Sequence, residues 1–317
     1  MQDDLDEDHK RRSPDQLQLD EASGIEALPT RAERYGKAKK RALEVLEYAK
    51  TCAGRGEHFE IPFKRLEACG EYLVFHHYPA INQVRLHAAR FCKMHILCPL
   101  CAIRRGAKAL GAYLPKYEAL RASRPLLRPF LVTVTVKDGS DLVERFKHLQ
   151  GAMYELWKRR SRGRGSVLDP VEAAVWSYEI KRGSGSGLWH PHSHMVAMAP
   201  AAPCSVRLAQ EWLDITGDSF MVDVRPIDID SPAGGFLEVF KYALKFSDMT
   251  EADTVEAYRA LRKRRLVASA GAFRGTEIPD VLTDEPLDDL PFVEYFYRYF
   301  DGGYGLDRGR GTRPDNF

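Results

Sequence analysis

The stretch "EAAVWSYEIKRGSGSGLWHPHSHMVAM", residues 172–198, holds two strand-like runs on either side of a glycine-rich turn. The turn is built around Gly183, Gly185 and Gly187. A connection this short joins antiparallel strands, because parallel strands need a crossover of about a dozen residues or more. The stretch therefore predicts an antiparallel pair, which favours an α+β protein over one with a parallel sheet.

Strands and helices alternate along the rest of the chain, and there are no internal repeats. Hydrophobic periodicity and capping residues predict helices at 37–52, 102–120, 140–160 (with Ser140 as N-cap), 205–217 and 234–249. β-branched runs predict strands at 130–136, 173–181 and 220–228, besides the one that carries the histidines.

Composition divides the chain into four segments. Residues 1–36 hold ten Asp/Glu and five Lys/Arg with few large apolar side chains, so we expect an acidic, disordered tail. We expect a helical, cysteine-containing segment at 37–125, a domain carrying the histidines at 126–250, and a basic and aromatic extension at 251–317.

The basic residues gather beyond the acidic tail. After residue 36 the chain keeps 42 of its 47 Lys/Arg and 35 of its 45 Asp/Glu, a net charge of +7. They cluster at 157–165, 259–265 and 307–313. Each cluster alone fits a solvated face, but together they favour a polyanion partner. The candidate DNA-backbone contacts are Arg104, Arg105, Lys158, Arg159 and Arg160.

Two further patterns concern the compartment. No run approaches the roughly 18 apolar residues of a membrane span, and the first residues lack the apolar core of a secretory signal. We therefore expect a cytoplasmic protein without a membrane partner. In that reducing compartment the six cysteines are expected to be thiols or metal ligands rather than disulfides.

His190, His192 and His194 alternate along a strand and therefore share one face of it. Folding the hairpin about residue 185 places Glu179 opposite residues 191–192, beside the histidines. We favour His192 and His194 as ligands, because His190 precedes Pro191 at the strand's entry. Two imidazoles and a carboxylate suit Mn²⁺ or Mg²⁺, with Zn²⁺ or Fe²⁺ chemically allowed. The alternative is a polar sheet face with unliganded histidines.

A second cluster lies about fifty residues downstream, in "EVFKYALKF", residues 238–246. Glu238 and Tyr242 are four residues apart and Tyr242 and Lys245 three apart, so a helix would present them on one face. Tyrosine has a pKa near 10 and needs a neighbouring cation to react as the phenolate at neutral pH. Lys245 could supply that cation or hold a phosphate.

The order of "FLVTVTV" (130–136), "HPHSH" (190–194) and "YALK" (242–245) resembles rolling-circle replication initiators of small plasmids, single-tyrosine members of the HUH endonuclease superfamily. The resemblance covers roughly residues 65–275. It implies a central antiparallel sheet that carries the histidines, with flanking helices and the tyrosine on a helix against the sheet.

The activity that the resemblance implies is nicking at a replication origin. Tyr242 would become linked to the 5′ phosphate and free a 3′-OH that primes synthesis, and the reverse reaction would rejoin the strand. Glu238 would serve the second cut, at termination, as a general base. One departure is Ser193, where the family usually has a bulky apolar residue. Since its side chain points to the opposite face, the ligands should be unaffected.

"FCKMHILCPLC" and the upstream "ACGEY" supply Cys69, Cys92, Cys98 and Cys101, a set that could form a closed tetrahedral Zn²⁺ site. His87 and His95 are substitutes if Cys69 lies elsewhere. The resembled family carries a similar segment, matched here by "CPLCAIRR". We expect a small zinc-ribbon-like segment; buried free cysteines are the alternative.

The resemblance implies single-stranded and origin DNA as partners, with host helicase and polymerase, and it allows a homodimer. Three rival readings stay open. A mobilisation relaxase of the same superfamily typically places the tyrosine before the histidines. A compact HUH transposase is usually about half this length. The third is a zinc-containing DNA-binding regulator with a relic site, which would form no covalent adduct with DNA.

Overall fold

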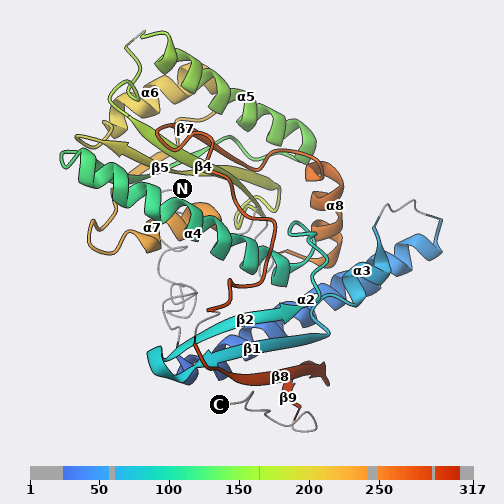
Figure 1. Cartoon of the computed structure of the whole chain (residues 1–317). Coiled ribbons are helices and arrows are strands. Elements are labelled where there is room, and N and C mark those ends of the chain that lie inside the picture. The colour runs from blue at the N-terminus through green and yellow to red at the C-terminus, as the bar shows by residue number, and fades with distance from the viewer. Residues whose placement is uncertain (1–23, 57–60, 164, 242–248, 288–289, 308–317) are drawn as a thin grey trace. The chain divides into compact units, whose positions relative to one another are not determined.

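Figure 1 shows the computed structural model, which describes residues 24–56, 61–163, 165–241, 249–287 and 290–307. The chain forms two units. Unit 1 combines residues 1–107 with 279–317, and unit 2 consists of residues 108–278. The histidines and Glu179 belong to unit 2, and the cysteine cluster belongs to unit 1.

The sheet of unit 2 has five strands within the described part of the chain, in the order β6-β3-β5-β4-β7, and every neighbouring pair is antiparallel. The strands are β3 (Arg128–Thr135), β4 (Ala173–Arg182), β5 (Trp189–Ala199), β6 (Val222–Pro226) and β7 (Val267–Gly271). The α+β class and the antiparallel sheet expected from the sequence are therefore confirmed.

The β4–β5 hairpin fixes the register of the sheet. Glu179 lies opposite His192, as the fold about residue 185 predicts. The histidine strand β5 is the middle strand, paired with β4 on one side and β3 on the other. Because side chains alternate between faces, Glu179 shares a face with His192 and His194, whereas Ser193 points to the other face.

Helices cover both faces of this sheet. They are α4 (Pro99–Ser123, of which residues 108–123 belong to unit 2), α5 (Leu142–Ser161), α6 (Ser205–Thr216), α7 (Ala233–Phe240) and α8 (Glu251–Leu261). Figure 1 shows α5 and α6 on one side of the sheet and α7 on the other. Phe146 of α5 contacts Tyr178, whose ring centroid is 5.5 Å away, so α5 lies on the Tyr178 and Ser193 face. The histidines and Glu179 face the side of α7.

Capping residues explain the start of α5 and the end of α6. The N-cap of α5 is Asp141, whose carboxylate accepts a hydrogen bond from the Glu144 backbone N–H at 3.0 Å, rather than the expected Ser140. A carboxylate also favours the positive end of the helix dipole. Helix α6 ends at Gly217, as expected, in the left-handed conformation with φ of 70°.

Helix α7 is shorter than the expected helix at 234–249. It ends at Phe240, and Lys241 has extended backbone angles of φ −53° and ψ 173°. Phe236 and Phe240 are buried against Tyr117 and Tyr113. These contacts with other parts of the chain set the position of α7, and helix propensity alone does not predict them.

Unit 1 has a second antiparallel sheet, in the order β2-β1-β8-β9 within the described residues. Its elements are η2 (Ile25–Ala27), α2 (Leu28–Gly54), α3 (Phe63–Glu67), β1 (Tyr72–Tyr78), η3 (Pro79–Ile81), β2 (Gln83–Ala89), β8 (Val293–Phe300) and β9 (Gly303–Leu306). The expected extension at 251–317 is thus divided, since α8 and β7 join unit 2 while β8 and β9 join unit 1.

Helix α2 begins inside the segment expected to be a disordered tail. Leu28, Ala32 and Tyr35 recur at helical spacing and are buried. The acidic composition of the whole segment hides this apolar stripe, so the expected boundary at residue 36 is too late.

None of the helices in the described part of the chain combines the length and apolar character that a membrane span requires.

Candidate metal centres

Glu179, His192 and His194 converge on one face of the β4–β5 pair. His192 Nε2 lies 3.5 Å from one carboxylate oxygen of Glu179, and His194 Nε2 lies 3.5 Å from the other. One ligand atom from each residue lies within 4.8 Å of the others. His194 is the most exposed of the three, at 14% of its side chain.

The spacing fits a shared divalent ion better than direct hydrogen bonds. A nitrogen–oxygen distance of 3.5 Å is long for a hydrogen bond, whose usual range ends at about 3.2 Å. Metal–ligand bonds of about 2.1 Å place neighbouring ligands about 3.0 Å apart in octahedral geometry and about 3.4 Å apart in tetrahedral geometry. Two imidazole nitrogens and a carboxylate are also hard or borderline donors that suit such an ion.

The protonation states match metal ligation. Burial alone raises the pKa of Glu179, but the neighbouring charges of His192 and His194 outweigh burial and hold it well below its ordinary value. Burial lowers the pKa of His192 to about 4. At neutral pH the group therefore offers a carboxylate and a neutral imidazole, the forms that bind metal.

Thr133 on β3 orients His194, a contact that sequence reasoning missed. Its hydroxyl lies 3.0 Å from His194 Nδ1 and directly opposite in the β3–β5 pairing. In the tautomer in which Nδ1–H donates to this hydroxyl, Nε2 keeps its lone pair on the side of Glu179. On the other face, the hydroxyl of the fully buried Ser193 donates to the Ser177 carbonyl at 2.8 Å. This polar contact accommodates serine where the resembled family has an apolar residue.

His190 is set apart from the other two histidines. Its Nδ1 lies 2.6 Å from the Asp138 carboxylate, and the other oxygen of Asp138 accepts from the Ser186 hydroxyl at 2.5 Å. The metal-type group contains His192 and His194 but not His190 among the described residues. The signal for this partner was available in the sequence, as an acidic residue in the turn that follows the strand at 130–136.

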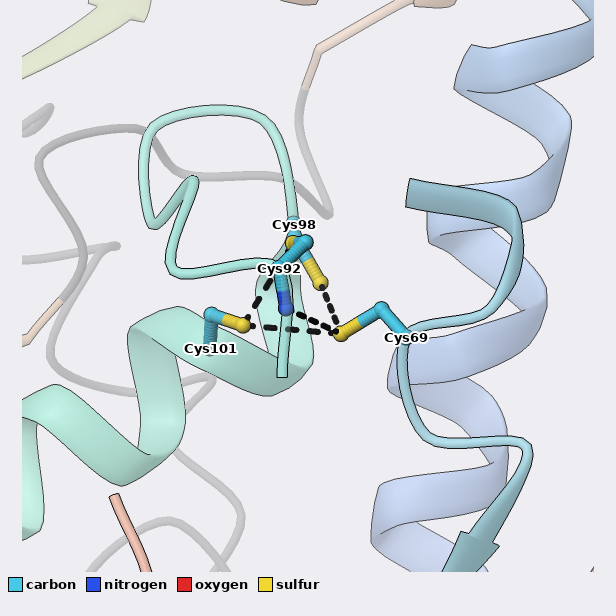
Figure 2. Close-up of side chains that lie close together, drawn as sticks. All are labelled: Cys69, Cys92, Cys98 and Cys101. Carbon is cyan, nitrogen blue, oxygen red and sulfur yellow. Dashed lines mark hydrogen bonds between the residues drawn. The ribbon is translucent and has the colours of Figure 1, made fainter. Parts of the chain in front are cut away.

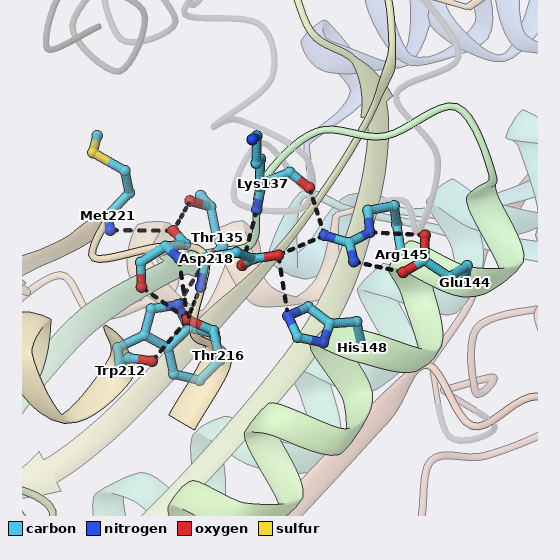
Figure 3. Close-up of polar contacts among 10 residues, drawn as sticks. Thr135, Lys137, Glu144, Arg145, His148, Trp212, Thr216, Asp218 and Met221 are labelled. Atoms are coloured by element: carbon cyan, nitrogen blue, oxygen red, sulfur yellow. Dashed lines mark hydrogen bonds and ion pairs between the residues drawn. The ribbon is translucent and has the colours of Figure 1, made fainter. Parts of the chain in front are cut away.

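Ion pairs and hydrogen bonds around Asp218 hold the loop that carries Asp138 in place (Figure 3). The Asp218 carboxylate binds Arg145 at 2.6 Å and lies 3.3 Å from His148 Nε2, both on α5. Arg145 also donates to the Lys137 carbonyl at 3.3 Å. The network therefore holds the end of β3, and with it Asp138, against α5.

Of the expected nucleophile cluster, the structure describes only Glu238. Tyr242 and Lys245 lie outside the described residues. Glu238 is buried on α7, a helix that packs against β4 and β5, and it forms an ion pair with Lys241 at 2.6 Å. The alternative to a catalytic role is an ion pair of Glu238 with Lys241 or Lys245 on an exposed helix; the pair with Lys241 is present, whereas Glu238 is buried rather than exposed.

The four cysteines of unit 1 form a second cluster (Figure 2). Cys69 Sγ lies 3.7 Å from Cys98 Sγ and 3.5 Å from Cys101 Sγ, and Cys92 Sγ lies 3.5 Å from Cys101 Sγ. All four are buried. With metal–sulfur bonds of about 2.3 Å, tetrahedral sulfur ligands lie about 3.8 Å apart, so the cluster has the size of a closed zinc site.

The substitute ligands are not part of this cluster. Among the described residues the group consists of cysteines alone, and the His87 ring stacks on His76 with a centroid distance of 3.8 Å. The ammonium of Lys39, 3% exposed, donates to the carbonyl of Glu67, two residues before Cys69. Burial lowers the pKa of Lys39, and its electrostatic interaction with Cys69, Cys98 and Cys92 opposes that shift.

Of the five basic residues expected to contact DNA, Arg104 is enclosed by the fold and the other four are more accessible. Arg104 is 1% exposed and donates to the Asp284 carboxylate, to the Leu282 carbonyl at 2.8 Å and to the Tyr35 hydroxyl at 3.1 Å. A guanidinium enclosed in this way does not reach DNA, so the hypothesis that Arg104 contacts phosphate is wrong.

The other four basic residues remain accessible to differing degrees. Arg105 forms an exposed pair with Asp280 at 3.3 Å, and Lys158 pairs with Glu155 at 3.0 Å. Arg160 donates to the Val171 carbonyl and so is partly occupied by the fold. Arg159 is half-buried.

Comparison with protein families gives one match. A family model described as "Replication protein" matches residues 83–294, more than half of the 317-residue chain. The match includes both candidate metal ligands on β5, Glu179 on β4, and three of the four clustered cysteines. No curated protein and no solved structure matches the chain significantly.

Proposed function

Because this chain belongs to the replication protein family, we propose that it initiates plasmid rolling-circle replication by nicking one DNA strand at the origin. The observation that carries the proposal is the convergence of Glu179, His192 and His194 on neighbouring strands. A sheet with the histidines on its middle strand also agrees with the HUH endonuclease resemblance.

The proposed reaction is a transesterification at phosphorus. The phenolate oxygen of Tyr242 forms a bond to the scissile phosphorus, and the bond from phosphorus to the 3′ oxygen breaks. The phenol proton leaves to solvent, the 3′ oxygen takes up a proton, and the resulting 3′-OH primes synthesis. Lys245 favours the phenolate or holds the phosphate through its positive charge. The reverse reaction rejoins the strand at termination.

Glu179, His192 and His194 would hold a divalent ion, Mn²⁺ or Mg²⁺. When bound, such an ion supplies Lewis-acid polarisation of the phosphate and a template that orients it. The chain's own residues prepare the site: the hairpin register sets Glu179 opposite His192, and Thr133 orients the His194 ring.

The cysteine cluster is proposed to hold structural Zn²⁺. Its four buried sulfurs leave no room for a substrate, which is typical of a structural rather than a catalytic site. Partners in this scheme are origin DNA, also as a single strand, and the host helicase and polymerase; a homodimer is compatible with it. We also propose that the protein is cytoplasmic.

A covalent adduct decides the proposal. The purified protein is mixed with an end-labelled single-stranded origin library and Mn²⁺, and the products are separated on a denaturing gel. We expect labelled DNA to migrate with the protein, and Tyr242→Phe to abolish this band while DNA binding stays nearly unchanged. An adduct formed by Tyr242→Phe would exclude Tyr242 as nucleophile. No adduct from the wild type would favour a zinc-containing DNA-binding regulator.

A further inference from the structure

The backbone around Cys69 is held by parts of unit 1 that contribute no cysteine to the cluster. Residues 67–71, which we call the Cys69 turn, connect helix α3 to strand β1. Three carbonyl groups of this turn accept hydrogen bonds, one each from helix α2, strand β8 and strand β9. The spacing of the cysteines does not account for these contacts.

Tyr304, in the C-terminal strand β9, reaches the residue next to Cys69. Its hydroxyl donates to the Gly70 carbonyl at 2.5 Å. Gly70 has a φ of 66°, and a Cβ placed there would lie 2.6 Å from the Tyr304 hydroxyl oxygen and 2.5 Å from Leu100 Cδ2. Glycine adopts this backbone conformation readily and has no Cβ to collide. Tyr304 from β9 and Leu100 from the start of α4 therefore pack directly against the Cys69 turn.

Strand β8 holds the end of the same turn. The backbone N–H of Tyr299 donates to the Glu71 carbonyl at 3.0 Å. From the next residue onward β1 pairs with β8, since Tyr72 lies opposite Arg298. The sheet formed with the C-terminal strands therefore continues up to the turn that carries the cysteine ligand.

Helix α2 holds the beginning of the turn. The buried ammonium of Lys39 donates to the Glu67 carbonyl and interacts electrostatically with Cys69. Helix α2 also packs against β9. An early helix and the C-terminal strands thus fix the Cys69 turn together.

Cys69 is the one member of the cluster that comes from outside residues 92–101. Its sulfur lies 3.7 Å from that of Cys98 and 3.5 Å from that of Cys101. The tetrahedral arrangement therefore closes only when the Cys69 turn is in place. Contacts that orient metal ligands typically change metal affinity by about 10- to 100-fold.

We propose that Tyr304 and Lys39 are positioning residues of the cysteine metal site, and that docking of strands β8 and β9 and metal binding therefore strengthen each other. The inference rests on the zinc site of the proposed function and extends it, because it makes the C-terminal strands part of that site. Coupling between two binding events is reciprocal. The strands should thus hold the metal, and the metal should hold the strands.

The first test measures the zinc affinity of the full-length protein by competition with a chromophoric chelator. Tyr304→Phe should bind zinc about fivefold more weakly, because it loses one hydrogen bond worth about 1 kcal/mol. Lys39→Met keeps the length of the side chain and removes the ammonium, so its zinc affinity should fall about tenfold. Thermal unfolding verifies that each variant is folded.

The matched controls are Tyr297→Phe and Lys40→Met. Tyr297 is on β8 and packs edge-on against Phe75, and within the described residues its hydroxyl has no hydrogen bond. Lys40 is the exposed neighbour of Lys39 on α2. Both controls should bind zinc as the wild type does, because neither side chain contacts the Cys69 turn.

The second test uses the wild type and so does not depend on the folding of a variant. Trypsin is added to the zinc-loaded and the chelator-treated protein, and cleavage is followed by mass spectrometry. Cleavage after Arg298, inside β8, requires the strand to leave its sheet and reports the population of that open form. Removing zinc should speed it about fivefold or more, as expected for a typical coupling between two sites. Cleavage after Lys147, on α5 of unit 2, should change little.

Wild-type zinc affinity in both folded variants would overturn the inference. So would cleavage after Arg298 that is independent of zinc. Equal acceleration at Lys147 would also overturn it, because the metal would then hold the whole protein folded rather than the C-terminal strands. Wild-type protein without zinc would overturn the zinc assignment together with the inference, whereas the adduct assay tests nicking separately.

Discussion

Thr133 offers a test between the proposed metal centre and a polar sheet face with unliganded histidines. Its hydroxyl fixes the His194 ring through Nδ1 at 3.0 Å. Contacts that orient ligands typically contribute about 10- to 100-fold in metal affinity. We therefore expect Thr133→Val, which keeps the shape and removes the hydroxyl, to weaken Mn²⁺ binding about tenfold, as measured by calorimetric titration.

The matched control is Thr135→Val. Thr135 is on the same strand and face, and is equally buried, but its hydroxyl contacts Ser219 at 3.4 Å instead of a histidine. Its Mn²⁺ affinity should stay close to that of the wild type. Equal affinities in the two variants would show that the Thr133 contact does not act on the metal.

Glu238 should affect termination more than the first cut. It is buried and paired with Lys241, so it is held in place on a helix that packs against the histidine strand. Glu238→Gln keeps the size and removes the base. We expect the variant to form the Tyr242 adduct and to accumulate multimeric products in a replication assay. Normal unit-length products would reduce Glu238 to a structural ion pair.

The sequence predicted the contacts that are local and missed those that are not. Glu179 and His192 face each other across a short hairpin, so counting residues from the turn was enough. Thr133 and Asp138 reach His194 and His190 from β3 and from the turn after it, more than fifty residues away. Arg104 looked like a phosphate ligand because sequence alone does not reveal burial.

At the scale of elements, the cysteine cluster joins the paired strands β1 and β2 to the start of α4. Cys69 lies between α3 and β1, Cys92 follows β2, and Cys98 and Cys101 lie at the start of α4. The spacing of the last pair made the site predictable. Cys69 was proposed as the fourth member from the sequence, with His87 and His95 as substitutes, and the structure groups Cys69 with the other three cysteines.

Cys98→Ser should therefore release about one zinc per chain, as measured by elemental analysis. It should also lower the melting temperature by about 10 °C or more, because a closed zinc site contributes several kcal/mol directly to folding. Cys204→Ser is the control, since Cys204 is exposed and outside the cluster. Wild-type protein without zinc would contradict the assignment.

At the scale of the whole molecule, unit 1 joins the two ends of the chain, which no local pattern indicates. Asp284, near the C-terminus, accepts from Arg104 on α4, from Arg31 on α2 at 3.1 Å and from the Leu86 backbone N–H at 2.7 Å. Three segments that are distant in sequence therefore meet at one carboxylate. Contacts between residues so distant in sequence leave no periodic pattern. Composition therefore suggested a separate C-terminal extension.

Asp284→Asn should destabilise unit 1 by about 3 kcal/mol near pH 7, because it leaves the buried Arg104 charge without its carboxylate. Burial alone raises the pKa of Asp284, but Arg104 and Arg31 outweigh burial and hold it below its ordinary value. The ionised carboxylate therefore stabilises the fold fully above the unfolded pKa of about 3.9, and this stabilisation disappears as the pH falls through the lower folded value.

Urea unfolding at a series of pH values should show the wild type and Asp284→Asn curves far apart at pH 7 and converging below about pH 4, where the unfolded carboxylate also binds its proton. Asp280→Asn removes the partner of Arg105 from a pair in which Asp280 is 85% exposed, so it should leave stability unchanged at every pH. A gap between the wild type and Asp284→Asn that stays constant into acid would mean that Asp284 acts through packing rather than charge.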